Sequence, residues 1–433
     1  MSQPASDVKS ASFFSSRLAH RAEWFSVAAI FLAVNLVSAL VQHPLTFHGG
    51  KAWELSVYYD LASQLRHGLP LIGAAPAVYR IGAPWLAAIL PFDIERNFFL
   101  ISLTANVVTI GSLVILLRMF VDSWKIRTAL LAAFMLHWLG PIRFLYFVAA
   151  DTDAIAIMVI VLGLLAIERW KRRERPVDYL VVLAVVILGS FFREIALTIG
   201  VLFLFVPTFI DEEGLNMKRL MLTLTPIVCG AAALAGLHYF IHAKEEYSFA
   251  SSALNWSYTK SLPVFLLGIA IAIGPVACLL VLDWKRTAQL LRQHREIGAG
   301  LALVLLLALV GGSDTERFIL WGTPLILIVY GSWFERNRVV LRDYAFVGIL
   351  VVLQLIAERL FWTTPDLGYS VTNTPIFLTS LSSNAYYLNL YSYHAPKAVS
   401  ALMLLEYLAV YAVIISWAAY ATSRRRREMA AED

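Results

Sequence analysis

Long apolar runs follow one another along almost the whole chain, separated by short polar segments. Runs of about 15 to 24 residues recur from residue 24 to residue 420, close to the roughly 20 residues that a helix needs to cross a hydrocarbon core about 30 Å thick. No stretch alternates between apolar and polar positions as a strand of a membrane barrel does. The pattern therefore predicts an all-α, polytopic transmembrane helical bundle.

The runs predict about twelve spans, and each must be helical because irregular backbone cannot satisfy its N–H and C=O groups in lipid. We place the spans at 24–42, 97–118, 128–146, 153–170, 177–191, 195–210, 219–240, 262–282, 297–312, 317–333, 344–361 and 398–420. The apolar segment 81–91 carries Pro84 and Pro91 and is too short to span. We expect it to be interfacial or re-entrant, beside a short surface helix that Gly68 and Pro70 end.

Composition excludes an ordinary soluble domain. Hydrophobic residues make up 59% of the chain and charged residues only 15%, against roughly 25% charged in a typical soluble domain. The formal charge of +5 lies in short basic clusters beside apolar runs, which indicates membrane orientation and no nucleic-acid partner. Cys229 and Cys278 both fall inside apolar runs, so no disulfide framework is expected.

Basic residues orient the predicted bundle. With the N-terminus in the cytoplasm, 24 of the 35 Lys and Arg residues fall in the inner segments. The clearest clusters are ERWKRRERP at 168–176, DWKRTAQLLRQHRE at 283–296 and SRRRRE at 423–428. Since positive charge collects on the cytoplasmic side, both termini are predicted to be cytoplasmic, and the long segments 43–96, 241–261 and 362–397 face outward.

Four charged clusters interrupt or border the apolar pattern, and all four face outward in this orientation. They are Glu54 with Asp60, Asp151 with Asp153, Arg193 with Glu194, and Asp314 with Glu316 and Arg317. Charges near the hydrocarbon core are costly unless they pair or line a wet cavity, so they are functional candidates. The alternative for Arg193 and Glu194 is an ion pair that only ends two short helices.

These residue types suit transfer of a group from a lipid-linked phosphate. Arginine holds phosphate through several donors, and a carboxylate can take the proton of an acceptor hydroxyl as that hydroxyl attacks. A sugar on a polyprenyl phosphate has an anionic leaving group that needs no protonation. One base and one cation at the leaving phosphate would therefore suffice.

Short motifs resemble those of the GT-C superfamily of polytopic glycosyltransferases, bacterial type. The resemblance covers roughly residues 24 to 333 and rests on YYDLASQL, PAVYRIGAPWLAAILP, AADTDAIAIMVIVLGLLAIERW, SFFREIALTIGVLFLFVP and GGSDTERFILWGTP. It implies a polyprenyl-phosphate sugar donor, a glycan, lipid or protein acceptor, and an active site on the periplasmic face of the bacterial inner membrane. The expected organisation is a cytoplasmic tail at 1–23, a catalytic module at 24–333, C-terminal helices at 334–421 and a basic cytoplasmic tail at 422–433.

The resemblance also implies a catalytic acidic residue in the first outer loop. Asp60 matches that position best and Glu54 is second, although the paired acidic residues common in the family are absent here. Phosphate would be held by Arg80, Arg193 and Arg317. Asp151 and Asp153 begin a span, where they could instead cap the helix dipole; with Asp314 and Glu316 they could also bind a divalent cation, Mg or Mn.

Two other classes of function fit the same outline. A transporter or flippase also uses charges in the membrane and about twelve spans, but transporters commonly carry internal repeats and charges spread through the membrane. No repeat relates the two halves of this chain, and its charges gather at one face. A silent scaffold subunit would need no polar outer cavity.

Overall fold

The computed structural model is helical throughout the residues it describes, which are 6–51, 54–206, 210–211, 214–245, 247–312, 314–357 and 397–432. Within these residues the strands are two short pairs. β1 (Ile72–Gly73) lies parallel to β4 (His242–Ala243), and β2 (Ile210–Asp211) lies antiparallel to β3 (Gly214–Leu215). The all-α prediction is confirmed, and the outer segment predicted at 362–397 falls almost entirely outside the described residues.

The helices follow the apolar runs of the sequence closely. In chain order, with η for a 3-10 helix, they are α1 (Ser6–Val41), η1 (Phe47–Gly50), α2 (Glu54–Arg66), η2 (Ala77–Tyr79), α3 (Gly82–Ile89), α4 (Ile94–Leu117), α5 (Trp124–Leu136), α6 (Pro141–Phe144), α7 (Asp153–Arg173), α8 (Pro176–Phe192), η3 (Glu194–Ala196), α9 (Leu197–Leu204), α10 (Met217–Phe240), α11 (Phe249–Thr259), α12 (Leu262–Ile273), η4 (Pro275–Asp283), α13 (Trp284–Gln293), α14 (Arg295–Val310), α15 (Thr315–Trp321), α16 (Thr323–Arg336), η5 (Val340–Arg342), α17 (Tyr344–Ala357) and α19 (Lys397–Glu432).

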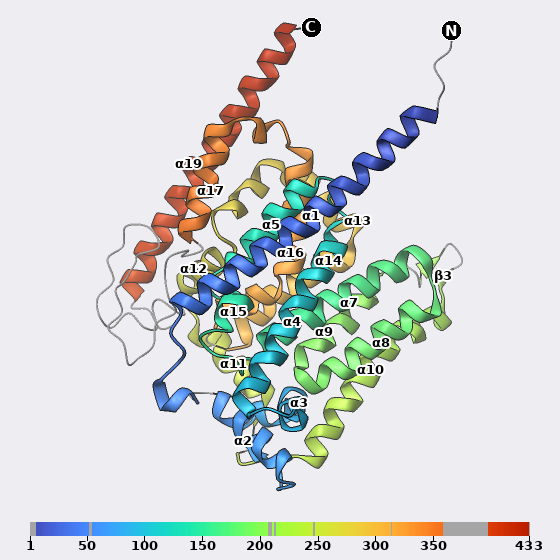
Figure 1. The fold of residues 1–433 in the computed structure, drawn as a ribbon, viewed down its shortest axis with the longest axis vertical. Coiled ribbons are helices and arrows are strands. Elements are labelled where there is room, and N and C mark those ends of the chain that lie inside the picture. The colour runs from blue at the N-terminus through green and yellow to red at the C-terminus, as the bar shows by residue number, and fades with distance from the viewer. Residues whose placement is uncertain are drawn as a thin grey trace.

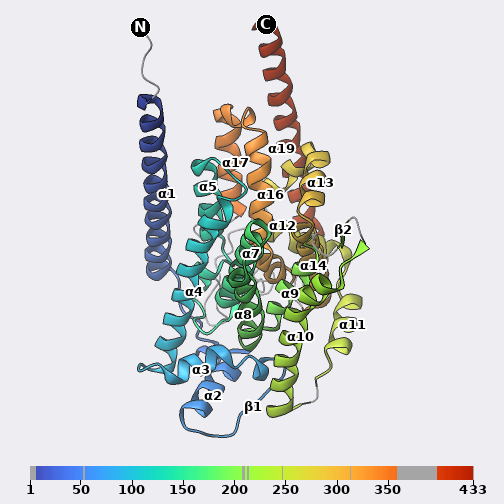
Figure 2. The same cartoon turned by 90° about the vertical axis from the view of Figure 1, so that its right-hand side faces the viewer.

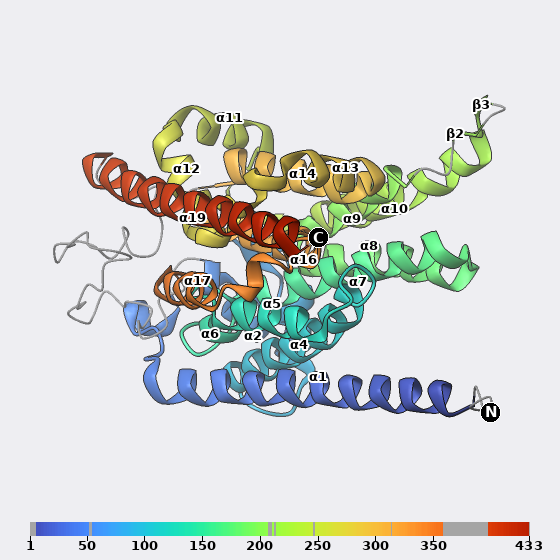
Figure 3. The ribbon, with the colours of Figure 1, turned by 90° about the horizontal axis from the view of Figure 1, so that it is seen from above.

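The two chain termini lie at one end of the bundle, and α2 and α3 lie at the other (Figures 1 and 2). Seen from above, α1 runs along one flank, with α11, α13 and α14 on the opposite flank (Figure 3). The first loop thus folds into two short helices, α2 and α3, that cover the end of the bundle away from the termini.

Fewer helices than expected are long enough to cross a membrane alone. Among the described residues, four helices have the length and apolar composition of a span, and the count rises to seven if each of three bent helix pairs is one span. The bent pairs turn by 99°, 105° and 65° at short breaks. The chain is a helical membrane protein, and about twelve spans stays a prediction, because several apolar runs form helices of 8 to 17 residues.

The run predicted as one span at 262–282 is broken in the middle. α12 ends at Ile273; the next residue, Gly274, has a φ of 67° that suits glycine, and Pro275 follows. The freed carbonyls of 272–274 accept hydrogen bonds from His137 Nε2 (3.0 Å), Tyr330 (3.4 Å) and Tyr411 (3.2 Å). Side chains of three other helices therefore satisfy a break that lipid could not.

The N-terminal half of α1 is fixed to the bundle by a buried ion-pair cluster around Glu23. Glu23 is 1% exposed and accepts from Arg118 (2.6 Å) and Arg127 (2.5 Å). The tail predicted at 1–23 is helical from Ser6 onward, because α1 continues without a break into the first predicted span. These contacts join α1 to α4 and α5 at the end of the bundle that carries the termini.

Replacing Gly163 by alanine is expected to lower the free energy of unfolding by about 1–2 kcal/mol, because added atoms overpack a filled core. A Cβ at this position of α7 would lie 2.6 Å from two carbon atoms of Ile199 on α9. Thermal unfolding of the purified protein in detergent measures the effect. Gly111→Ala in α4 is the matched control, since its Cβ would meet nothing within 4 Å. Equal melting temperatures for the two variants would contradict this account of α7 packing.

Candidate functional site

Arg80 is the centre of the first half of a charged network. Its side chain leaves the turn after η2 and is buried, with 6% of the residue exposed. Nε and Nη2 donate to the two oxygens of Glu194 at 2.9 and 2.5 Å. Nη1 donates to Glu54 at 2.8 Å and to the hydroxyl of Tyr58 at 3.0 Å. One guanidinium thus joins α2 to η3, in the bidentate geometry that arginine favours with carboxylate.

Asp153 is the centre of the second half. It begins α7 and is 6% exposed. Its Oδ1 accepts from Arg193 at 2.7 Å and from the indole of Trp321 at 3.0 Å, and its Oδ2 accepts from Arg317 at 2.5 Å. Arg317 also donates to Asp151 at 2.6 Å. This half joins α7, the end of α8 and α15.

Two consecutive residues link the halves. α8 ends at Phe192, and Arg193 is extended, with φ −163° and ψ 139°. Because successive side chains of extended backbone point to opposite sides, Arg193 reaches Asp153 while Glu194 reaches Arg80. The cationic face of Arg193 also lies 4.5 Å from the Trp321 ring centre, a cation–π contact. The pair that could have been a plain helix end is therefore the junction of the network.

The network carries more negative than positive charge. Its three guanidinium groups, of Arg80, Arg193 and Arg317, face four carboxylates, of Glu54, Glu194, Asp151 and Asp153, which leaves one net negative charge when all are ionised. This sum omits Asp314, 3.7 Å from Arg317.

Two carboxylates outside the predicted spans respond in opposite directions. Burial alone would raise the pKa of Glu54, but attraction to the arginines, Arg80 first, outweighs it and lowers the pKa to about 2. Burial raises the pKa of Asp151 to about 6, with Asp153 adding repulsion, although Arg317 opposes both. Near neutral pH, Glu54 is therefore held ionised, and Asp151 is the carboxyl that takes up a proton first.

Asp60, the first candidate for the base, lies outside this network. It is exposed on α2 and lies two residues from buried Tyr58, which at 100° per residue places it on the opposite face of the helix. No described residue forms an ion pair with it. Glu54, the second candidate, lies one turn before Tyr58 and accepts from its hydroxyl at 3.2 Å. The helical face, and not the position in the loop, decides which carboxylate meets the arginines.

The remaining predicted residues lie beside the second half. Asp314 precedes α15 and approaches Arg317, while Glu316 is fully buried in the first turn of α15. Lys260 was not predicted as a site residue. It is 7% exposed and donates from Nζ to the carbonyl of Ala308. Its position just before α12, within the segment 241–261 that the sequence predicts to face outward, could have indicated that it belongs near the site.

Three further residues of the network were not predicted, although each lies close in the sequence to a charged candidate. Tyr58 lies four positions after Glu54 and Trp321 four positions after Arg317, so each shares a helix face with a charged candidate. Thr152 stands between the two aspartates, and its hydroxyl accepts from Arg193 at 2.8 Å. Polar side chains that lie next to a charged candidate, or one helical turn from it, could therefore have been predicted as members of the network.

Two sets of residues have ligand chemistry for a metal. Asp151 and Asp153, at the end of the bundle away from the termini, already contact guanidinium groups. At the opposite end, Glu168, His294 and Glu296 bring their ligand atoms within 4.8 Å of one another. There Lys171 Nζ lies 2.9 Å from Glu168 and 2.6 Å from Glu296. The ammonium group occupies the place that a metal cation would take, so this second cluster is an ion-pair junction between α7 and α14.

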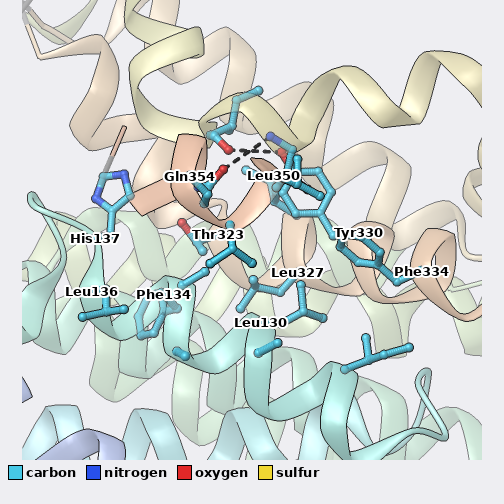
Figure 4. A pocket seen from close by; sticks show the side chains of 18 of the residues that line it. Leu130, Phe134, Leu136, His137, Thr323, Leu327, Tyr330, Phe334, Leu350 and Gln354 are labelled. Carbon is cyan, nitrogen blue, oxygen red and sulfur yellow. Dashed lines mark hydrogen bonds between the residues drawn. The ribbon is translucent and has the colours of Figure 1, made fainter. Parts of the chain in front are cut away.

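An apolar cavity of about 380 Å³ lies within one helical turn of Arg317 along α15, because Leu320 lines it. The cavity lies between α5, α12, α16 and α17. The residue of α15 that lines it is Leu320, which lies between Arg317 and Trp321 in the sequence, close to the start of α16. Figure 4 shows Leu130, Phe134, Leu327 and Leu350 around it. The only labelled side chains with polar groups are His137, Thr323, Tyr330 and Gln354. A charged site and an apolar cavity are therefore neighbours along α15 and α16.

Comparison of this chain with models of protein families, with curated proteins and with solved structures finds no match.

Proposed function

We propose that the protein is a membrane glycosyltransferase of the GT-C type, which transfers a sugar from a polyprenyl-phosphate donor to a glycan, lipid or protein acceptor. The observation that carries the proposal is the network itself. Three arginines and four carboxylates from the first loop, the start of α7, the α8–η3 junction and α15 meet in one cluster. A chain does not bury this much charge without partners or function. The site would face the periplasm or exterior of a bacterial inner membrane.

Glu54 is the carboxylate that we propose as the general base. It belongs to the first outer loop, its side chain is 38% exposed, and its low pKa keeps it ionised. An acceptor hydroxyl oxygen attacks the anomeric carbon while its proton passes to Glu54. The bond from that carbon to the phosphate oxygen breaks, and the phosphate leaves with the electron pair. One carbon–oxygen bond forms as the other breaks, and one proton is transferred.

The leaving phosphate needs positive charge, and Arg317 is the guanidinium best placed to supply it. Its side chain is 18% exposed, whereas those of Arg80 and Arg193 are 7% and 5% exposed. A guanidinium aimed at the developing phosphate charge stabilises the transition state. Because the network is net negative, a divalent cation such as Mg or Mn near its carboxylates would favour phosphate further; its chemistry would be charge neutralisation alone.

The cavity beside α15 supports a lipid-linked donor. A polyprenyl phosphate has an anionic head and a branched apolar chain, and it needs a charged site continuous with an apolar one. Leu320 and Thr323 line the cavity within two turns of Arg317. Lengthening the donor chain should therefore lower the KM for the donor, because each methylene removed from water contributes roughly 0.8 kcal/mol.

A transporter or flippase is the second candidate, and the break between α12 and η4 favours it. Discontinuous helices with free carbonyls bind substrates and ions in many transporters. Here the carbonyls of 272–274 already accept from His137, Tyr330 and Tyr411. That occupancy is the reason to place transfer ahead of transport.

One experiment separates the two functions. Lipid-linked sugars and surface glycans from cells with and without the gene are compared by mass spectrometry, and the purified protein is reconstituted in vesicles with the donor lipids that change. Transfer predicts an unconsumed lipid-linked sugar in the deletion strain and a new glycosidic product in the vesicles. Movement of the lipid across the vesicle membrane with no covalent product would overturn the proposal in favour of a flippase.

A further inference from the structure

A second groove lies at the end of the bundle that carries the termini, between α17 and α19. It has a volume of about 790 Å³ and is lined by Asp343 and Ala345 at the start of α17 and by a stripe of α19. The stripe includes Val413, Trp417, Tyr420 and Arg424, residues spaced three or four apart and hence on one face of the helix. The groove is far from the charged network, which lies at the other end of α7 from the termini.

Side chains along the stripe change character in one direction. Ala412 and Val413 are apolar, Ser416 is small, Trp417 and Tyr420 are aromatic with polar tips, and Arg424 is cationic. The twelve steps from Ala412 to Arg424 extend about 18 Å at 1.5 Å per residue. Aromatic residues of this kind gather where the headgroups of a bilayer begin. The order therefore matches a phospholipid lying along α19, with its acyl chains near Val413 and its phosphate near Arg424.

The end of the groove at Arg424 carries a positive charge. Arg424 is followed in the sequence by three more arginines, at 425–427. The N-terminus of α17 points to the same end, where the helix dipole favours an anion. Asp343 is the single acidic residue among the lining residues, and it is engaged in capping α17, since its Oδ1 accepts from the backbone N–H of Phe346 at 3.1 Å. The charge of this end is complementary to an anionic headgroup.

The groove is also open where an acyl chain would lie. Val413 is 57% exposed and Tyr420 62% exposed, although both stand on a helix that packs against the core at Tyr407, Ile414 and Ala418. A valine that is exposed on a membrane helix usually faces bulk lipid. Val413 instead lies in a groove that ends at Arg424, and this combination suits a single bound lipid.

We propose that the groove between α17 and α19 is a specific site for one anionic phospholipid of the leaflet on the side of the termini. The site rests on the membrane character of the chain and not on the glycosyltransferase proposal. Its function would be to hold the C-terminal helix against α17, because the headgroup would contact Arg424 while the acyl chains fill the space beside Val413.

Native mass spectrometry of the full-length protein in detergent tests the site. The protein, stripped of lipid, is titrated with dioleoyl phosphatidylglycerol and, separately, with dioleoyl phosphatidylcholine. We expect one phosphatidylglycerol to bind about tenfold more tightly than phosphatidylcholine, since basic clusters at the membrane edge select anionic lipid. Equal affinity for the two lipids would overturn the proposal.

Three variants distinguish a built groove from general attraction to a basic end. Arg424→Gln removes the headgroup contact, and Ser416→Trp fills the groove without changing its charge; each should weaken phosphatidylglycerol binding about tenfold or more. Arg338→Gln is the matched control, because this arginine lies near the same end, pairs with Glu335 and does not line the groove. Melting temperatures in lipid-free detergent check that each variant is folded.

The outcomes are separable. If Ser416→Trp binds lipid like the wild type, or if Arg338→Gln weakens binding as much as Arg424→Gln, the groove is not the site and the lipid only surrounds a basic surface. If Ser416→Trp melts early, Val413→Phe replaces it, because this change stays on the exposed face and also narrows the groove. Sugar transfer is not measured here, so failure of this site leaves the proposed activity untouched.

Discussion

Replacing Glu54 by glutamine is expected to lower the rate of sugar transfer by about 10²–10⁴-fold, the range that a general base contributes. The amide keeps the size of the side chain and can still accept from Arg80 and Tyr58, but it cannot take a proton. The KM for the donor should change little, because Glu54 is not the residue proposed to hold the phosphate. Steady-state transfer by the purified variant in donor-containing vesicles measures both constants.

Asp60→Asn is the matched control for this variant. Asp60 stands on the same helix, is exposed and lies outside the network, so its amide should transfer at the rate of the wild type. Loss of transfer in Asp60→Asn, with normal transfer in Glu54→Gln, would restore the position that the family resemblance favours and would remove the network from catalysis.

The pH profile of transfer separates Glu54 from Asp151. With a pKa of about 2, Glu54 stays ionised from pH 8 down to pH 4, so a base at this residue gives no tenfold fall per pH unit in that range. The pKa of Asp151 is about 6. A base at Asp151 would therefore lose activity tenfold per unit below pH 6, and Asp151→Asn would be the inactive variant.

The sequence predicted the convergence of the charged clusters better than it predicted which carboxylate of the first loop joins them. Positive-inside counting placed Glu54, Asp151, Arg193 and Arg317 at one face, and the structure brings these residues into one network. Glu54 and Asp60 differ by six positions, and both follow the same apolar run. Only the orientation of α2 against Arg80 separates them, and that orientation depends on contacts with η2 and η3 that no local pattern records.

The predicted spans show the same division between local and tertiary information. Hydropathy located the helices well, since it measures what lipid or core will accept. It did not locate the breaks at Gly274 and at Gly322, because a break inside the bundle is stabilised by side chains from distant helices. His137, Tyr330 and Tyr411 lie 57 to 137 positions from the carbonyls that they satisfy. The spacing of residues along the sequence cannot predict contacts between residues that lie so far apart.

Replacing Arg80 by methionine is expected to lower the free energy of unfolding by about 2–4 kcal/mol. Removing one partner of a buried ion pair costs about 3–5 kcal/mol, and we reduce this figure because the carboxylates of Glu54 and Glu194 are 38% and 44% exposed and water can screen them. Methionine fills most of the volume, so the loss reports charge and hydrogen bonding. Unfolding of the purified protein in detergent gives the value.

The double variant Arg80→Met/Glu194→Gln decides whether the cost comes from unpaired charge. Arg80 makes its two-point contact with Glu194, so neutralising this carboxylate in the absence of the guanidinium should recover part of the stability, about 1–2 kcal/mol, as coupled partners do in a double-mutant cycle. Arg96→Met is the control, since Arg96 pairs with Asp93 on the exposed surface and such pairs contribute at most about 1 kcal/mol. If Arg80→Met melts like Arg96→Met, the cluster is a set of solvated ion pairs, and the argument from buried charge to a functional site fails with it.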